Sequence, residues 1–341
     1  MNGRRTQSLF FAGMLALVVA FFALLFYGPV EIPFAQVASV LWGSGAESPY
    51  VGTIVLETRL PMAIAALCCG SMLSVAGLMM QTTFHNPLAG PSVLGVSSGA
   101  SLGVAILMLG AGGYLFSAWQ PFLSTAAALV GGLGAILVLY LFSGAIRSGV
   151  ALLVVGIMIS YLCSSCIALL NYFAPADEIR SYLVWGLGSF SGLRLRSAIW
   201  LAVMSLIILC PTIIFTKPLN AMLMGERYLE SVGFSARSTR GWILLFTGLL
   251  VAVPTAFCGP IGFIGLIVPH LCRLLFRSSN HAVLIPATII FGALLSELCA
   301  LIGIIPASGF GILPVNIITP LIGVPVILYL LIRRNRIPYF S

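Results

Sequence analysis

Side chains that carry catalytic chemistry are scarce in this chain, and the single lysine excludes one common activity. Lys217 follows Ile213-Ile214-Phe215-Thr216, and no glycine stands near it. A P-loop nucleotide site requires G-x-x-x-x-G-K-[ST], because the glycine-rich backbone surrounds the phosphates. The chain therefore has no P-loop of its own, and we predict no catalytic residues.

The cysteines and histidines give weak signals for metal or redox chemistry. Cys163 and Cys166 have C-x-x-C spacing, yet all eight cysteines lie in or at the ends of apolar segments. Packing of small polarizable residues between helices is the favoured interpretation. Haem ligation by His85, His270 or His281 is a minor alternative. We predict no metal site.

Glu297 is the only acidic residue inside a long apolar segment. A carboxylate within a membrane is costly and marks a functional site by default. Two interpretations remain open at this stage. Glu297 is either a neutral or hydrogen-bonded packing group, or a proton-coupling site of a secondary transporter.

The composition identifies the solvent that surrounds these residues. The chain has 341 residues, of which 7% are charged and 60% are hydrophobic. A soluble protein carries about 25% charged residues, so soluble enzymes, nucleic-acid-binding proteins and disordered chains are poor interpretations. We predict an all-α polytopic membrane protein that forms one domain over residues 1–341 and contacts lipid but no nucleic acid.

Runs of about 20 apolar residues predict membrane-spanning helices, and the sequence contains ten candidates. A cytoplasmic N-terminus leaves four of the 16 basic residues on the outer side, Arg59, Arg180, Arg194 and Arg196. This bias fits the positive-inside rule, so we predict that both termini are cytoplasmic. The ten candidates are residues 8–28, 61–82, 92–110, 121–143, 150–170, 197–216, 241–258, 260–276, 283–302 and 312–332.

Four connections between these segments have informative sequences. In the outer loop 29–60, Ile32 to Trp42 has an amphipathic pattern and is predicted to lie on the membrane surface. Residues 217–240 form the only sizeable cytoplasmic loop. Residues 81–100 are rich in proline and glycine, which indicates either a tight turn or a constriction that lines the pathway. Between residues 254 and 262, Pro254 and Gly259-Pro260 are predicted to interrupt the helices.

Four motifs resemble the FecCD family of ABC-transporter permeases, over about residues 30 to 334. They are Arg59-Leu-Pro61 with Gln81, Asn86-Pro-Leu-Ala-Gly-Pro-Ser-Val-Leu-Gly-Val-Ser-Ser-Gly-Ala100, Gly262-Phe-Ile-Gly-Leu-Ile-Val-Pro-His270 and Leu313-Pro-Val-Asn-Ile-Ile-Thr-Pro-Leu-Ile-Gly-Val-Pro325. The family resemblance implies the type II importer architecture, with ten spans in a bacterial inner membrane.

The resemblance also implies a division of labour. Two permease chains, identical or closely homologous, line a central pathway, and two separate ATPase subunits bind ATP and Mg. A periplasmic binding protein delivers the substrate. The implied substrate is an iron chelate, either a siderophore complex or haem, with cobalamin as the alternative. No cofactor is expected in this chain.

Site residues carry over from the family position by position. The ATPase-coupling segment is expected within 217–240, where Tyr228, Leu229 and Val232 are predicted to form an apolar face that seats in a partner groove. Asn86 and Leu88 are expected at the cytoplasmic gate. The full coupling set is Gly225, Glu226, Arg227, Tyr228, Leu229, Glu230, Val232 and Gly233.

This sequence departs from the family pattern in two places. At the second half of the gate, Gly149 and Val150 stand where the cobalamin member has a polar pair, and Ser148 is adjacent. On the outer side, family arginines pair with glutamates of the binding protein, and such pairs orient docking. Here a second common arginine is replaced by Met62. The expected docking residues are Arg59, Arg180, Arg194 and Arg196. For the last three, the alternative is that they anchor the chain at the membrane surface by snorkelling.

Overall fold

The computed structural model describes residues 3–42, 49–90, 94–110, 120–146, 149–304 and 312–332 of the chain. Within these ranges the regular structure consists of helices, and no strand is present. The predicted all-α fold is therefore confirmed.

Seven helical stretches in the described part of the chain are long and apolar enough to cross a membrane. Three further apolar helices lie inside predicted spans but are shorter, at Val96–Gly110, Ile264–Phe276 and Val315–Leu328. The count of ten spans therefore stays a prediction. The seven stretches are Gly3–Phe26, Tyr50–Thr83, Phe122–Ala145, Ala151–Phe173, Leu195–Leu223, Ala236–Cys258 and His281–Ile304.

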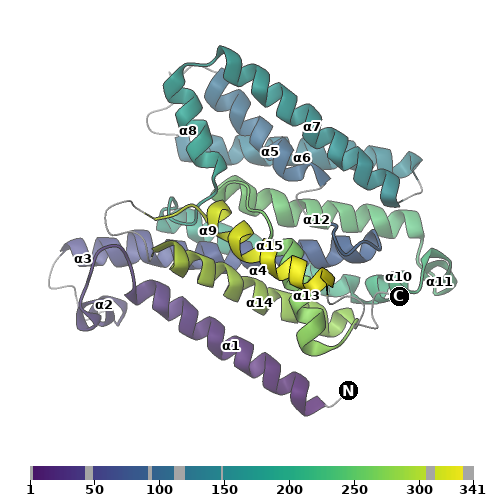
Figure 1. Cartoon of the computed structure of the whole chain (residues 1–341), viewed down its shortest axis with the longest axis horizontal. Coiled ribbons are helices and arrows are strands. Elements are labelled where there is room, and N and C mark those ends of the chain that lie inside the picture. Colours follow the sequence, from purple (N-terminus) through teal and green to yellow (C-terminus); the bar gives the residue numbers. More distant parts are fainter. Residues whose placement is uncertain are drawn as a thin grey trace.

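Helix α4 (Leu60–Thr83) is the centre of the fold (Figure 1). Every residue from Cys68 to Phe84 is buried, because helices surround α4 along most of its length. The helices that pack against it include α9 (Leu195–Leu209), α12 (Ala236–Cys258), α13 (Ile264–Phe276) and α14 (His281–Ile304).

Small residues allow these helices to approach α4 closely. A Cβ atom added at Gly77 would lie 1.7 Å from the carbonyl oxygen of Gly265 on α13, and one at Gly70 would lie 2.2 Å from that of Gly292 on α14. Membrane helices associate without a hydrophobic driving force between them, so such small-residue contacts supply the close packing.

A second group of helices lies along one side of α12 (Figure 1). It begins with α5 (Val96–Ala105), which continues into the π-helical turn η3 (Ile106–Gly110). The remaining members are α6 (Gln120–Ala145), α7 (Gly149–Phe173) and α8 (Ala176–Gly186). Helix α7 exposes large apolar side chains, including Met158, Tyr161 and Leu162, which need lipid or a partner chain as cover.

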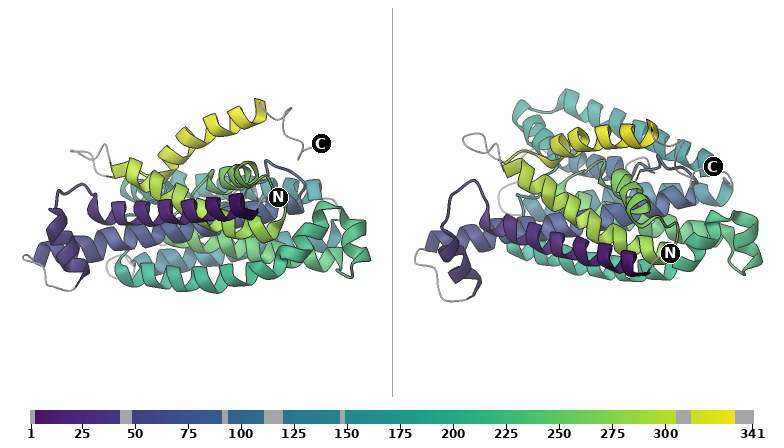
Figure 2. Two further views of the ribbon diagram at one scale, coloured as in Figure 1. Left: turned by 90° about the horizontal axis from the view of Figure 1, so that it is seen from below. Right: turned by 60° about the horizontal axis from the view of Figure 1, so that its bottom comes forward.

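Helices α1 (Gly3–Phe26) and α15 (Val315–Ile332) run along the bundle, and the remaining elements lie at its two ends (Figures 1 and 2). The start of α1 and the end of α15 point toward the end that carries α10 and α11, which we call the α10–α11 end. It carries η5 (Cys210–Phe215), α10 (Thr216–Leu223) and α11 (Glu226–Ser231), whereas α2 (Phe34–Leu41), α3 (Pro49–Ile54) and the π-helical turn η1 (Val55–Arg59) lie at the opposite end.

The structure settles the helix boundaries around Pro254. Helix α12 ends at Cys258 and α13 begins at Ile264, so the predicted separation at Gly259-Pro260 is confirmed. Pro254 does not break α12, however, and that part of the prediction is wrong. The helix continues through Pro254 because residues 250–256 are all buried, and neighbouring helices keep an interrupted turn in place.

Arg59 has a structural position that the sequence did not indicate. Its side chain is buried, and Nη1 donates hydrogen bonds to the carbonyl oxygens of Leu25 at 3.0 Å and Phe26 at 2.8 Å. Its Nη2 donates to the carbonyl oxygen of Val30 at 2.5 Å. These carbonyls include the last two of α1, which have no partner within that helix. Arg59 therefore closes the end of α1 and is buried in this chain, and its docking role stays a prediction.

Gly77 provides a test of the close packing around α4. We expect Gly77→Ala to lower the apparent midpoint of thermal unfolding in detergent by more than about 3 °C, because overpacking costs about 1–3 kcal/mol or more. Gly134 on α6 is a matched control, since nothing lies within 4 Å of a Cβ atom added there. Equal midpoints for Gly77→Ala and Gly134→Ala would contradict the packing described above.

Candidate functional site

The end of α4 at the α10–α11 end is closed by its own backbone. The amide of His85 donates to the carbonyl of Thr82, and the amide of Asn86 donates to the carbonyl of Gln81, both at 3.2 Å. These two bonds form a Schellman motif, in which the residue after the helix cap adopts the left-handed conformation. That residue is His85, with φ 47°, although glycine is usual there.

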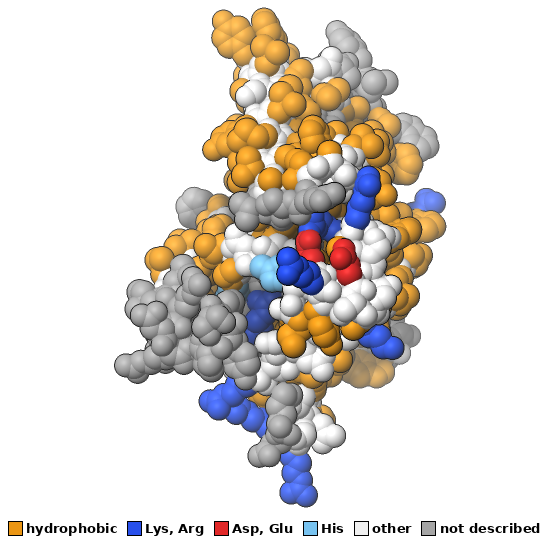
Figure 3. Space-filling model, turned by 90° about the vertical axis from the view of Figure 1, so that its right-hand side faces the viewer, with side chains coloured by type: hydrophobic (Ala, Val, Ile, Leu, Met, Phe, Trp, Pro, Cys, Tyr) orange, Lys and Arg blue, Asp and Glu red, His pale blue; other side chains and the backbone are white. Residues whose placement is uncertain are grey.

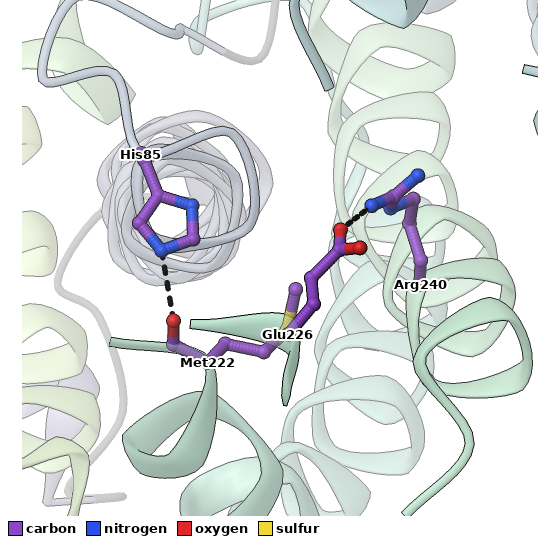
Figure 4. Close-up of polar contacts among 4 residues, drawn as sticks. All are labelled: His85, Met222, Glu226 and Arg240. Carbon is purple, nitrogen blue, oxygen red and sulfur yellow. Dashed lines mark hydrogen bonds and ion pairs between the residues drawn. The ribbon is translucent and has the colours of Figure 1, made fainter. Parts of the chain in front are cut away.

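The side chain of His85 reaches from α4 to α10. Its Nε2 lies 2.8 Å from the carbonyl oxygen of Met222 (Figure 4). A carbonyl oxygen only accepts hydrogen bonds, so Nε2 carries the proton and donates it. This bond fastens the end of α4 to the last turn of α10.

The turn that follows His85 contains the predicted gate residues. The Oδ1 atom of Asn86 accepts a hydrogen bond from the amide of Leu88 at 2.9 Å, and the carbonyl of Asn86 accepts one from Ala89 at 3.0 Å. Asn86 thus fixes the turn through its own side chain, as asparagine does in many turns. Leu88 is about half exposed, so its side chain is available to narrow a pathway.

A second polar linkage joins α10 to α14 and to α4. The Oδ1 atom of Asn220 accepts hydrogen bonds from the amide of His281 at 2.9 Å and from its Nδ1 at 2.8 Å. Because the backbone amide of His281 only donates, the atom of Asn220 that faces it is the carbonyl oxygen Oδ1. This oxygen only accepts, so Nδ1 of His281 carries the proton. On the other side of the ring, Nε2 lies 2.8 Å from the hydroxyl of Thr82.

A third linkage joins α4 to α13. Arg273 donates from Nη1 to Oε1 of Gln81 at 2.5 Å. The Nε2 atom of Gln81 donates to the carbonyl of Leu266 at 3.2 Å and lies 3.4 Å from Nδ1 of His270. Because guanidinium nitrogens only donate, the orientation of the Gln81 amide is determined.

An ion pair holds the start of α11 against α12. Nη2 of Arg240, a buried residue of α12, contacts Oε1 of Glu226, the first residue of α11 (Figure 4). Glycines precede and follow α11, with φ 100° at Gly225 and φ 90° at Gly233. These left-handed conformations suit glycine, so α11 is a short helix between two sharp bends, as the sequence indicated.

The surface of α11 differs from the predicted face in one respect. Tyr228 and Val232 are 47% and 46% exposed, whereas Leu229 is 0% exposed and packs in the chain's own core. Leu229 therefore faces inward, so only Tyr228 and Val232 of the predicted apolar face are open to a partner, and the coupling role of these residues stays a prediction. A helix of six residues has an inner side as well as an outer side, and Leu229 fills the inner one.

Exposed charged side chains lie on this helix and beside it. Figure 3 shows acidic, basic and histidine side chains gathered on the α10–α11 end of the molecule. Glu226, Arg227 and Glu230 are all exposed there, and His85 is exposed as well. This end therefore presents a mixed charged surface with the apolar side chains of Tyr228 and Val232 beside it.

The remaining predicted site residues are only partly described. Gly149 and Val150 begin α7, but their side chains lie outside the described residues, as does all of Ser148. The second half of the predicted gate therefore stays a prediction. Arg180 on α8 and Arg194 and Arg196 at the start of α9 are exposed. Helix α8 lies toward the end of the bundle opposite α10 and α11 (Figure 1).

Glu297 lies in the interior of α14. The residue is 0% exposed, and neither carboxylate oxygen has a hydrogen-bond partner among the described residues. A group of three or more His, Cys, Asp or Glu side chains that would hold a metal ion is also absent from the described part of the chain. Within the described residues, Glu297 is thus a buried carboxyl group without a hydrogen-bond partner.

Sequence reasoning missed the polar linkages of the α10–α11 end. The sequence contained one usable signal, because His85 occupies the position directly after an apolar helix and directly before Asn86-Pro87. Its partner Met222 is 137 residues away along the chain. Neither spacing nor residue type predicts a bond to a backbone carbonyl at that distance.

Comparison with known proteins places this arrangement in a family. The model of the FecCD transport family matches residues 16–333. The vitamin B12 import system permease protein BtuC of Klebsiella pneumoniae is 33% identical over 285 residues, which cover 82% of this chain and 83% of that protein. BtuC of Escherichia coli O6:H1 is 33% identical over 293 residues, covering 85% and 86%.

A solved structure has the same fold. It is described as an inward-facing conformation of a transporter assigned to the metal-chelate ABC type. The two chains superpose with a TM-score of 0.83 at 26% sequence identity, and the match covers 96% of this chain and 99% of the other.

The family match spans nearly the whole chain and includes every element of the α10–α11 end described above. The relatives are matched over most of their own length as well. The apolar helices show a multi-pass membrane protein. The chain is therefore a transport permease that belongs to the FecCD transport family.

Proposed function

We propose that this chain is the membrane-spanning subunit of an ATP-driven importer of bulky metal chelates in the bacterial inner membrane. The observation that carries the proposal is the family match over residues 16–333. The fold shared with a metal-chelate type ABC transporter supports it. In this proposal two permease chains form the pathway, and a periplasmic binding protein delivers the substrate to their outer side.

ATP and Mg bind to a separate ATPase subunit in this proposal. The missing P-loop around Lys217 supports this division. The α10–α11 end offers a surface that suits such a partner, with Tyr228 and Val232 exposed between Glu226, Arg227 and Glu230. An apolar contact rimmed by charges is a common form of helix recognition.

Two classes of substrate are candidates, iron chelates and cobalamin. The sequence motifs favour an iron chelate, either a siderophore complex or haem. The identity to vitamin B12 import permeases supports cobalamin equally well. All three are bulky chelates of a metal ion, so the pathway would face the whole chelate rather than the metal.

Uptake into vesicles tests the proposal. The permease is reconstituted in vesicles with an ATPase subunit and a binding protein of the same transport system, and ATP is supplied on the cytoplasmic side, inside the vesicles. We expect uptake of one among cyanocobalamin, haem and a ferric siderophore, and we expect that uptake to require both ATP and the binding protein. Uptake driven by a proton gradient without ATP would contradict the proposal.

The exposed face of α11 gives a second prediction. We expect Val232→Glu and Tyr228→Ala to reduce substrate-stimulated ATP hydrolysis in the assembled complex, because both side chains face the proposed partner. Leu229→Ala should instead destabilise the chain by about 2–5 kcal/mol, since it empties a buried site. Normal stimulation in Val232→Glu, measured at equal complex concentration, would exclude this face as the ATPase contact.

Glu297 tests the rival mechanism, a proton-coupled secondary transporter. We expect Glu297→Gln to keep ATP-driven uptake, because the amide has the same shape and an importer of this class does not require a titrating group there. Glutamine cannot release a proton at physiological pH, so a proton-coupled transporter would lose uptake in this variant. Loss of uptake with normal folding and normal ATP hydrolysis would favour the rival mechanism.

A further inference from the structure

His85 occupies a backbone position that disfavours its own residue type. It takes the left-handed conformation at the residue after the α4 cap, with φ 47°. Side chains with a Cβ atom pay a steric penalty there, which is why glycine predominates at this position of the Schellman motif. A strained residue at a helix end indicates that its side chain has a use.

The structure shows what the His85 side chain contacts. Its Nε2 donates to the carbonyl oxygen of Met222 at 2.8 Å (Figure 4). Glycine in the same place would relieve the strain but would leave this donor absent. The imidazole ring therefore contributes a connection between two helices that the favoured residue cannot make.

The two residues joined by this bond stand next to the two predicted functional segments. His85 directly precedes Asn86, which begins the turn that contains Leu88. Met222 lies in the last turn of α10, and only Leu223 and Met224 separate it from Gly225, where α11 is capped. The bond is thus a short path between the proposed gate and the proposed ATPase contact.

A parallel linkage restricts α10 further. Asn220, two residues before Met222, bonds to the backbone and ring of His281, and His281 contacts Thr82 near the end of α4. Two polar connections therefore tie α10 to the end of α4, one directly through His85 and one through His281 of α14. A segment held at two points moves with the helix to which it is tied, because rotation about one bond is blocked by the other.

We propose that His85 is a positioning residue that transmits movement between the α10–α11 segment and the gate turn. This inference rests on the proposed function. Displacement of α11 by an ATPase subunit would carry α10 with it, and the bond from His85 to the Met222 carbonyl would move the turn at Asn86 and Leu88 at the same time. His85 has no contact with substrate in this role.

Three variants of His85 separate the effect of losing the hydrogen bond from any effect on folding. His85→Gln keeps an N–H donor at similar reach, and His85→Met has similar length without a donor. His85→Gly removes the donor and relieves the backbone strain, so we expect it to fold at least as well as the parent chain. All three are assembled with the ATPase subunit and binding protein, and substrate uptake and ATP hydrolysis are measured in the same vesicles.

We expect the ratio of substrate imported to ATP hydrolysed to fall about three- to ten-fold in His85→Met and His85→Gly, in line with the loss of one hydrogen bond. His85→Gln should keep most of the parent ratio. The apparent midpoint of thermal unfolding of His85→Gly should equal or exceed that of the parent, which separates a coupling defect from a folding defect.

Parent-like ratios in both His85→Met and His85→Gly would overturn this inference and leave the proposed function intact. A fall of equal size in all three variants would also overturn it, because the donor would then have no part in the effect. Absence of ATP-driven uptake in the parent complex itself would instead reject the proposed function.

Discussion

Every polar backbone group buried away from water needs a hydrogen-bond partner within the protein. In this fold the requirement is clearest at the ends of α4 and α1. Helix α4 is buried from Cys68 to Phe84, so water cannot satisfy its last carbonyl groups. The Schellman bonds at Gln81 and Thr82 close one end. The buried guanidinium of Arg59 closes the end of α1 in a comparable way. Both solutions follow from the high cost of an unpaired buried carbonyl.

Closure of these helix ends also places the side chains on which the proposed mechanism depends. His85 is positioned by the turn that ends α4, and from there it reaches α10. Gln81 and Thr82 contact Arg273 and His281 from the same turn. One helix end therefore organises contacts to α10, α13 and α14. The proposed gate turn follows directly, so a change in any of these contacts acts on it.

The sequence predicted the architecture better than it predicted the roles of single residues. Apolar runs located the long helices, because length and hydrophobicity alone decide whether a segment suits a bilayer. The short helix α11 was also predicted where it lies. The side of α11 that faces inward was not, since Leu229 and Val232 are equally apolar and only the tertiary packing distinguishes them.

Arg59 shows the same limit for a charged residue. The family resemblance implied a docking role for it, but its hydrogen-bond partners are carbonyl groups 29 to 34 residues earlier in the chain. A single sequence contains no record of contacts to backbone atoms. The same reason explains why the bond from His85 to Met222 was not predicted, although the position of His85 beside the gate motif was visible.

The central claim is that the gate turn and the α10–α11 segment move as one unit. The direct test is the separation of two spin labels, placed at the exposed residues Leu88 and Leu223 in the assembled complex, with the exposed Cys210 replaced by serine. We predict one unchanged distance distribution without nucleotide, with ATP and with ADP and vanadate. A shift of several ångströms between these states would show that the two segments move independently and would contradict the account.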